Sequence, residues 1–362
     1  MTATETAEAH ESVPAQWLTD AVASVFGALG LSEQAAWRVA DSLVEADMRG
    51  IPSHGVMLVP MYADRIRDGS ITPRERADVV GDYGAIAVLD AGHALGVLTG
   101  DQAMALAVEK ARAFGVGAVT VRRAFHFGGA FRYVRAAAGQ GCIGIAAANT
   151  RPLMPAPGGA SPVVGNNPLA IAVPRVGAPP VILDIAMSEA ALGKIRLAVA
   201  EGREIPATWA TDATGQPTTD PVAAVAGLLL PAGGHKGYGL AFMIDVLAGV
   251  LSGGAYGQHV HGLYADTSRP NDCAHFFLAL DVAAFADVEA FARRLADLCD
   301  QVLCSVRAPG VDQVFLPGDI EHARYTRARQ AGVALAPSVF ARLVAVAAAV
   351  GVSIGNPPTE GR

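Results

Sequence analysis

The chain has 362 residues, of which 52% are hydrophobic and 17% charged, and its formal net charge is −7. A chain of this length can bury a large core and is expected to form about two domains. The negative charge and the lack of any Lys/Arg run argue against a nucleic-acid surface and against attraction to an anionic membrane.

The cysteines and the apolar segments indicate the compartment. Four cysteines lie in apolar segments without metal-ligand spacing: Cys142, Cys273, Cys299 and Cys304. They are expected to be buried free thiols in a reducing cytoplasm. Residues 1–11 lack the positive and then apolar pattern of a signal peptide. The longest apolar stretches are too short to span a bilayer. The sequence therefore predicts a soluble cytoplasmic protein.

The first segment, from Val13 to about Ile71, is predicted to be helical. Ser32 is a candidate N-cap, and apolar residues recur at helical spacing until Gly50. Residues 49–55 are then expected to form a loop, which a second helix over residues 56–67 would present.

From Ala85 the pattern changes to short apolar strands. Strands are predicted over 85–90, 117–121, 142–149, 169–173, 181–185 and 275–280, and helices over 101–114 and 131–138. Because several strands follow one another with only turns between them, antiparallel pairing is expected. A final helical region begins near Val288, with Phe291, Leu295, Leu298 and Val302 on one face.

These elements indicate an α+β fold. A central domain over residues 76–285 would be flanked by a helical domain formed from both chain ends, residues 1–75 and 286–362, which pack together. Residues 139–144 match G-x-G-x-x-G, but they follow a helical segment and precede a strand. A Rossmann loop has the opposite order, so a turn is the better interpretation and a Rossmann fold is not expected.

The segment from Gly233 to Leu240, Gly-Gly-His-Lys-Gly-Tyr-Gly-Leu, opens a long apolar helix. Glycines leave backbone N–H groups uncovered, the helix N-terminus carries partial positive charge, and Lys236 adds a full charge. These features favour a binding site for an anionic group such as a cofactor phosphate. The alternative is a glycine-rich cap on a buried helix, with a lysine that reaches water.

Ser53 and His54 lie in a loop bounded by proline and glycine. A histidine can donate a proton to an oxygen that becomes negative, and a neighbouring serine can hydrogen-bond the ring or a substrate. The alternative is a loop histidine that only caps a turn. No metal site is expected, because His259 and His261 have no acidic or thiol partner at ligand spacing.

Eight motifs occur in one order along the chain: residues 49–56, 126–129, 165–168, 184–188, 217–221, 233–240, 275–279 and 316–319. This series resembles the malate/L-lactate dehydrogenase family, which includes ureidoglycolate, sulfolactate and hydroxycarboxylate dehydrogenases and cyclic imino acid reductases. The resemblance covers about residues 15 to 350 and implies a mostly antiparallel, non-Rossmann sheet and an NAD or NADP cofactor.

The resemblance also implies roles for single residues. Ser53 and His54 would supply the proton-transfer group, although His126 is the acid/base in one branch of the family. His126, Phe127 and Gly128 would then line the cofactor and substrate. Further cofactor contacts are implied for Asn149, Thr150, Leu183, Asp184, Ile185, His235, Lys236, Gly318 and Asp319.

Two departures from the family bear on the substrate. Many members carry an arginine five residues after the motif serine, where it binds the substrate carboxylate, but this chain has Leu58. An apolar side chain cannot replace a bidentate arginine. The second departure is Asn166, which stands where the family has threonine. Arg49 is an alternative anchor for the carboxylate that the resemblance does not establish.

The resulting hypothesis is an NAD(P)-dependent enzyme that interconverts a 2-hydroxycarboxylate and its 2-oxo acid, with a histidine as acid/base. The family implies a homodimer. The alternatives are reduction of a cyclic imino acid and a catalytically silent binding or scaffold protein. The sequence settles neither the substrate nor the choice between NAD and NADP.

Overall fold

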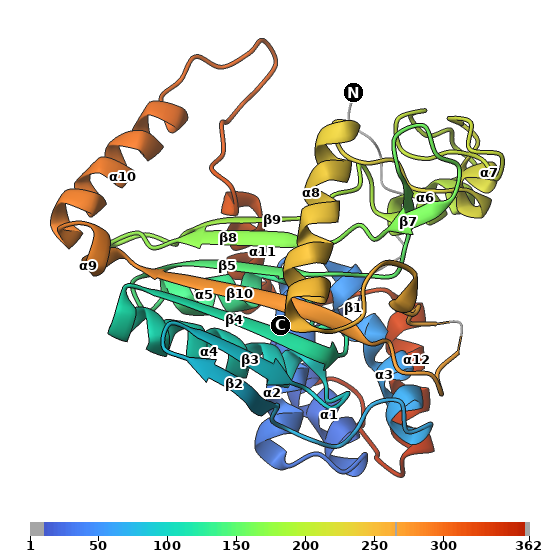
Figure 1. The fold of residues 1–362 in the computed structure, drawn as a ribbon. Helices are drawn as coiled ribbons and strands as arrows, with labels where there is room; N and C mark the ends of the chain where they lie inside the picture. Colours follow the sequence, from blue (N-terminus) through green and yellow to red (C-terminus); the bar gives the residue numbers. More distant parts are fainter. Residues whose placement is uncertain (1–10, 265, 359–362) are drawn as a thin grey trace.

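The computed structural model describes residues 11–264 and 266–358 of the chain. Its centre is a seven-stranded sheet with the strand order β2-β3-β4-β10-β5-β8-β9 (Figure 1). The strands are β2 (Asp78–Tyr83), β3 (Ile86–Asp90), β4 (Val116–Ala124), β5 (Cys142–Ala148), β8 (Leu169–Val173), β9 (Val181–Ile185) and β10 (Cys273–Asp281). Every neighbouring pair is antiparallel except β3 and β4.

Helices α4 (Gly96–Phe114) and α5 (Phe131–Ala138) cover one face of the sheet. Because α4 is the crossover between β3 and β4, this pair can be parallel. The side chains of Ala103 and Ala107 on α4 are small, so the helix approaches the strands closely. At Gly117 a side chain has no room, because its Cβ would lie 2.0 Å from the Ala107 carbonyl oxygen.

The opposite face carries α8 (His235–Asp245), which continues as a short π-helix, η3 (Val246–Val250). The π-helix lies against β10 and β4. Its Gly249 packs so closely that a Cβ would lie 2.7 Å from the amide nitrogen of Asn149. A smaller lobe beside α8 contains β6 (Met154–Pro155), β7 (Pro162–Val164), α6 (Leu192–Glu201), α7 (Pro221–Ala226) and η4 (Gly257–His259).

The two ends of the chain form the helical part of the molecule. It comprises β1 (Glu11–Val13), α1 (Ala15–Ala28), α2 (Glu33–Met48), η1 (Pro52–His54), η2 (Val56–Leu58), α3 (Val59–Arg67), α11 (Asp319–Ala331), β11 (Val333–Leu335) and α12 (Pro337–Ala349). β1 pairs with β11, α11 packs on α2, and α12 packs on α1 and α3. Their shared core includes Phe26, Leu43, Tyr62 and Leu343.

Helices α9 (Val282–Phe285) and α10 (Val288–Leu303) follow β10. Figure 1 shows α10 projecting beyond the sheet, away from the terminal helices. The sequence predicts that the whole region after Val288 packs against the N-terminal helices; α11 and α12 do so, but α10 contacts α9 instead. The division into residues 1–75, 76–285 and 286–362 stays a prediction.

The predicted fold class is confirmed, and most predicted elements appear within a few residues. Ser32 caps α2 by accepting a hydrogen bond from the Ala35 N–H, and Gly50 follows the helix with a φ of 75°. The predicted helix over 56–67 is split, because Pro60 lacks the N–H that an earlier α-helical turn would need. α4 begins five residues before the predicted start, at Gly96, where a Cβ would lie 1.9 Å from the Phe125 carbonyl oxygen.

Among residues 11–264 and 266–358, no helix is long and apolar enough to cross a membrane.

The close approach of α4 to β4 predicts the effect of Gly117→Ala. The new methyl group meets backbone atoms of α4, which cannot rotate away, so we expect a loss of about 1–3 kcal/mol in the free energy of unfolding. Gly239→Ala, inside α8 with no atom within 4 Å of its Cβ position, is the control and should not destabilise the protein. Urea unfolding of both variants measures the difference; equal stabilities would contradict the packing described here.

Candidate active site

The structure brings Ser53, His54 and His126 together. His54 ends the short helix η1, and its Nδ1 lies 3.0 Å from the Ser53 hydroxyl oxygen. His126 lies two residues after the end of β4. The two imidazole rings stack, with 5.3 Å between their centroids and 28° between their planes. Two motifs that are 72 residues apart in the sequence therefore form one polar cluster.

Tyr62 completes this cluster, and the sequence analysis missed it. Its hydroxyl oxygen lies 2.7 Å from Nδ1 of His126, and its side chain is completely buried on α3. A buried tyrosine needs a partner for its hydroxyl group. The signal available in the sequence was a tyrosine on the helix that follows the Ser53-His54 loop, but helical spacing alone made it one more core residue.

Burial disfavours the charged form of both imidazoles. It lowers the pKa of His54, and it lowers that of His126 to about 3, with a further contribution from His54 and His275. Burial also raises the pKa of Tyr62, so its hydroxyl stays protonated and can donate to Nδ1 of His126. In that arrangement the neutral His126 ring carries its proton on Nε2.

The residues after His126 are positioned by packing. The Phe127 ring stacks on His275 of β10, with 4.6 Å between centroids. Gly128 has a φ of 74°, which a glycine adopts without strain. His275 is completely buried, and its Nε2 lies 3.5 Å from the Cys273 sulfur. The sequence analysis quoted His275 within a motif but gave it no role.

The loop that carries His54 rests on Asp47 of α2, another residue that the sequence analysis missed. Its Oδ2 accepts a hydrogen bond from the Val56 N–H at 2.7 Å. A Cβ at Gly55 would lie 2.1 Å from the Asp47 carboxylate, so only glycine fits there. Asp47 therefore holds the two residues that follow His54 in the sequence.

A separate cavity of about 280 Å³ collects several of the predicted cofactor residues. Its lining includes Leu183, Asp184, Ile185 and Gly318, together with Arg49. Neither His54 nor His126 lines it. The cavity thus unites segments that are more than 100 residues apart, and its walls are largely apolar.

Two carboxylates near this cavity have protein partners. Asp184 Oδ2 accepts a hydrogen bond from the Phe131 N–H at 2.8 Å, at the start of α5, and burial raises the pKa of Asp184 to about 6. Asp319 Oδ2 accepts from the Leu316 N–H at 2.8 Å and closes its own loop. Asp184 therefore stabilises α5, and its predicted cofactor role stays a prediction.

Arg49 is also bound within the protein. It forms an ion pair with Glu45 at 2.8 Å, with both side chains 6% exposed. Its guanidinium lies 4.7 Å from the ring centre of Phe131 and 4.9 Å from that of Tyr325. Glu45 also pairs with Arg135 at 2.8 Å, so one carboxylate is shared by two guanidinium groups. The role of Arg49 as an anchor for the substrate carboxylate stays a prediction. Leu58, the other position singled out, is buried in the core of the helical part.

Asn149, Thr150 and Asn166 belong to a hydrogen-bonded network at the end of β5. The Asn149 side chain accepts from the Ala274 N–H at 2.7 Å and donates to Asp245 at 2.8 Å. The Thr150 hydroxyl donates to Asn166 Oδ1 at 3.0 Å. Asn149 thereby ties β5 to β10 and to α8.

His235 and Lys236 are exposed at the N-terminus of α8. Gly233 and Gly234 before them have φ values of 61° and 64°, and no atom lies within 4 Å of a Cβ at either position. The Gly233 N–H donates to Glu189 Oε2 at 3.3 Å and the Gly234 N–H donates to the Pro231 carbonyl oxygen at 3.0 Å, so phosphate binding at this turn stays a prediction.

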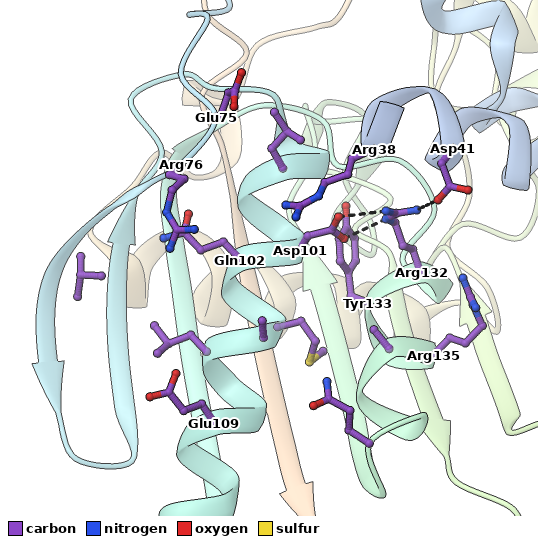
Figure 2. Close-up of a pocket in the computed structure, with 17 residues that line it drawn as sticks. Arg38, Asp41, Glu75, Arg76, Asp101, Gln102, Glu109, Arg132, Tyr133 and Arg135 are labelled. Carbon is purple, nitrogen blue, oxygen red and sulfur yellow. Dashed lines mark hydrogen bonds and ion pairs between the residues drawn. The ribbon is translucent and has the colours of Figure 1, made fainter. Parts of the chain in front are cut away.

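Another cavity, of about 660 Å³, lies between α2, α4 and α5 (Figure 2). None of the predicted site residues lines it. Its central Arg132 is bound by Asp101 at 2.9 Å and by Asp41 at 2.7 Å. This salt-bridge network joins α5 to α4 and α2.

The Asp47 carboxylate predicts a pH-dependent stability. Burial raises its pKa from 3.8 to about 7, although the Val56 hydrogen bond opposes the shift. Asp47 is therefore protonated in the folded protein but ionised in the unfolded chain between about pH 4 and pH 7. The free energy of unfolding of the wild type falls as the pH rises through this range. Asp47→Asn keeps an acceptor but cannot ionise. The difference in the free energy of unfolding between Asp47→Asn and the wild type should therefore increase by roughly 2–3 kcal/mol, in favour of the variant, between about pH 5 and pH 8.

Urea unfolding at the two pH values tests this prediction. Asp64→Asn, on the exposed side of α3, is the control. A constant difference between Asp47→Asn and the wild type would show that Asp47 ionises as easily in the folded protein as in the unfolded chain.

Comparisons with known proteins place this site in a family. The family model described as malate/L-lactate dehydrogenase matches residues 13–344. Malate dehydrogenase of Pyrococcus abyssi is 36% identical over 353 residues, which are 95% of this chain and 96% of that protein. Ureidoglycolate dehydrogenase (NAD(+)) of Escherichia coli K12 is 36% identical over 317 residues, 87% of this chain and 90% of that protein.

A solved structure supports the same assignment. Sulfolactate dehydrogenase from Methanocaldococcus jannaschii superposes with a TM-score of 0.90 at 34% sequence identity, and the match covers 95% of this chain and 98% of that one. The match extends over the sheet and the helical part, including the segments that carry His54 and His126. The chain belongs to the malate/L-lactate dehydrogenase family.

Proposed function

We propose that this protein is an NAD(P)-dependent oxidoreductase that interconverts a 2-hydroxycarboxylate and its 2-oxo acid. The observation that carries the proposal is the stacked pair of neutral imidazoles, His54 and His126, with Tyr62 on one of them. Family membership supports the dehydrogenase class. The cluster supplies what that reaction needs from a protein, namely a proton acceptor and a fixed hydrogen-bond donor.

His54 is the proposed acid/base. Its Nδ1 faces the Ser53 hydroxyl, which leaves Nε2 free for a substrate. In the oxidative direction the neutral ring takes the hydroxyl proton as hydride leaves the same carbon. In the reductive direction the protonated ring returns that proton to the oxygen, and a lowered pKa makes the ring a stronger acid.

His126 is the proposed hydrogen-bond donor. Because Tyr62 occupies Nδ1, the proton on Nε2 is available to the substrate oxygen. A pKa of about 3 keeps this ring neutral throughout the physiological range. The ring therefore orients and polarises the carbonyl group without changing its own charge.

The residues present fit a nicotinamide dinucleotide. The exposed N-terminus of α8, with the charge of Lys236, suits a phosphate, and the apolar cavity at Leu183 suits a flat ring. When bound, the nicotinamide supplies or accepts the hydride. We propose cofactor contacts for the predicted set of residues: Phe127, Gly128, Asn149, Thr150, Leu183, Asp184, Ile185, His235, Lys236, Gly318 and Asp319. The choice between NAD and NADP is left to experiment.

The activity itself is the first test. Purified protein is mixed with NADH or NADPH and a panel of 2-oxo acids plus one cyclic imine, and loss of the reduced cofactor is followed by absorbance. Oxidation by a 2-oxo acid is expected. His54→Ala should lower turnover about 100-fold or more while cofactor affinity stays close to that of the wild type. His322→Ala, an exposed histidine on α11, is the control.

The same assay separates the alternatives. If His126→Ala abolishes turnover and His54→Ala does not, the two roles are exchanged. Turnover of the imine alone would replace the 2-oxo acid assignment. A protein that binds neither cofactor would contradict the proposed function.

We also propose that the protein is a homodimer, because α10 exposes an apolar face. Phe291, Leu295, Leu298 and Val302 recur at helical spacing, yet Cys299 is the only buried residue of this helix. Leu298 is 57% exposed. An amphipathic helix whose apolar face meets water is typical of a subunit interface.

Leu298→Asp tests the dimer. Light scattering of the wild type should give twice the chain mass of 37.1 kDa, and the variant should shift toward the monomer, because a charge is costly in an apolar interface. Val176→Asp, at a valine between β8 and β9 that is 79% exposed, should leave the mass unchanged. A monomeric wild type would refute the interface.

A further inference from the structure

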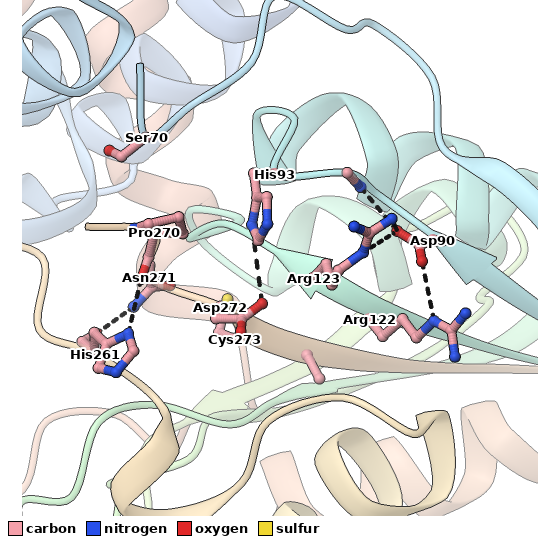
Figure 3. Close-up of polar contacts among 12 residues, drawn as sticks. Ser70, Asp90, His93, Arg122, Arg123, His261, Pro270, Asn271, Asp272 and Cys273 are labelled. Carbon is pink, nitrogen blue, oxygen red and sulfur yellow. Dashed lines mark hydrogen bonds and ion pairs between the residues drawn. The ribbon is translucent and has the colours of Figure 1, made fainter. Parts of the chain in front are cut away.

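Three strained residues meet beside the catalytic cluster. His93, Arg123 and Asp272 have φ values of 62°, 46° and 60°, and they are the non-glycine residues of the described chain with positive φ. The His93 N–H donates to the Arg123 carbonyl oxygen at 2.8 Å, and His93 Nδ1 lies 3.8 Å from Asp272 Oδ1 (Figure 3). Each such backbone costs about 1–3 kcal/mol, and strain of this kind concentrates at functional sites.

Arg123 belongs to a β-bulge in β4. His275 of β10 pairs with Val121, but Cys273, two residues earlier, pairs with Ala124. Two residues of β4, Arg122 and Arg123, therefore face the single residue between them on β10. An extra residue of this kind reverses which face of the sheet the following side chains occupy.

The reversal decides where His126 lies. Val121 and Ala124, three residues apart, both face the core under α4 and α5. Phe125 consequently joins the core of the helical part, where its ring packs edge-on against Tyr62 with 5.2 Å between centroids. His126 follows, and its Nδ1 meets the Tyr62 hydroxyl. Without the bulge, Phe125 would point to the other face and this hydrogen bond could not form.

Besides the bonds that the Arg122 and Arg123 carbonyl oxygens accept from the Ala91 and His93 N–H groups, one carboxylate binds the side chains of both bulge residues. Asp90 Oδ1 accepts from Arg123 Nε at 2.7 Å and from the Gly92 N–H at 3.0 Å, and its Oδ2 accepts from Arg122 Nε at 3.1 Å. Asp90 is 5% exposed. Burial opposes its ionisation, but the Arg123, Gly92 and Arg122 hydrogen bonds together hold the pKa of Asp90 below its ordinary value. The hydrogen bonds that Asp90 accepts therefore all come from the bulge and from the loop beside it.

We propose that Asp90 is a positioning residue for His126. By binding the side chains of Arg122 and Arg123, Asp90 stabilises the register of β4 in which His126 contacts Tyr62. It contacts neither imidazole, so it acts through the backbone of β4. This inference rests on the proposed function for its effect on turnover, but the geometry of His126 can be measured on the free protein.

The test replaces Asp90 by asparagine, which keeps the size and loses the charge. Asp82→Asn on the adjacent strand β2, which breaks the ion pair with Lys110, is the matched control. In the wild type, nitrogen-15 spectra of labelled histidine should show His126 as one neutral form with its proton on Nε2; the His126→Asn spectrum assigns the signal. In Asp90→Asn this signal should change toward an average of the two neutral forms. Asp82→Asn should not change it.

Turnover should follow the spectrum. A small displacement of a catalytic group can cost on the order of 100-fold, so kcat of Asp90→Asn should fall by about 10- to 100-fold while KM for the cofactor changes little. A purely structural role for Asp90 would lower the melting temperature and leave the His126 signal of the folded protein unchanged. An unchanged His126 signal in folded Asp90→Asn overturns the proposal.

A second variant, Arg123→Gly, tests the same proposal in case Asp90→Asn does not fold. Glycine accepts a φ of 46° without strain but removes the tether to Asp90. The same change in the His126 signal is expected in a protein that retains its fold, and a wild-type signal here also overturns the proposal. If the wild type reduces none of the substrates tested, the proposed function fails, but the spectra of these variants still decide the positioning role.

Discussion

The arrangement of this molecule depends on the place of β10 in the sheet. This strand, formed late in the chain, lies between β4 and β5 and pairs antiparallel with both. Asn149 at the end of β5 links that strand to β10 and α8, because its side chain hydrogen-bonds the Ala274 N–H and the Asp245 carboxylate. His275 on the same strand supports Phe127, the residue after His126. The loop that carries His126 is therefore supported from the sheet on one side and from α3 on the other.

The site combines burial with few charges. His54, His126 and Tyr62 are polar groups in a largely apolar setting, and burial disfavours the charged form of each. Neutral groups cost less to bury than ions, and each of the three has a hydrogen-bond partner within the cluster. An arrangement of this kind suits a reaction in which a proton and a hydride leave together, because the protein then needs no permanent charge at the reacting carbon.

The glycines near the site serve packing more than flexibility. Gly55 and Gly96 leave room for the Asp47 carboxylate and for the Phe125 carbonyl oxygen, respectively. A side chain at either position would displace the backbone next to His54 or His126. The strained trio at His93, Arg123 and Asp272 is the opposite case, since larger residues occupy a conformation that glycine would adopt freely. Their side chains, or those of their neighbours, make contacts that glycine could not make.

Local pattern determined much of this protein. The helical ends, the strands β8 and β9 and the helix α5 follow from apolar spacing, and Ser32 and Gly50 mark the ends of α2 through short-range hydrogen bonds and backbone conformation. The motifs also pointed to Ser53, His54 and His126, because unusual residue types in loops stand out without any knowledge of packing. The resemblance carried by those motifs indicated the family that the comparisons then showed.

Only the tertiary structure decided which of these residues meet. Tyr62 and Asp47 lie on helices where their spacing resembles that of ordinary core or surface positions, and their contacts with His126 and Val56 appear only after the chain folds. The bulge at Arg123 is equally invisible in the sequence, because a strand register depends on its partner, and β10 lies about 150 residues away. Local sequence sets the preferences of each segment, whereas contacts between distant segments are set by the packing of the whole core.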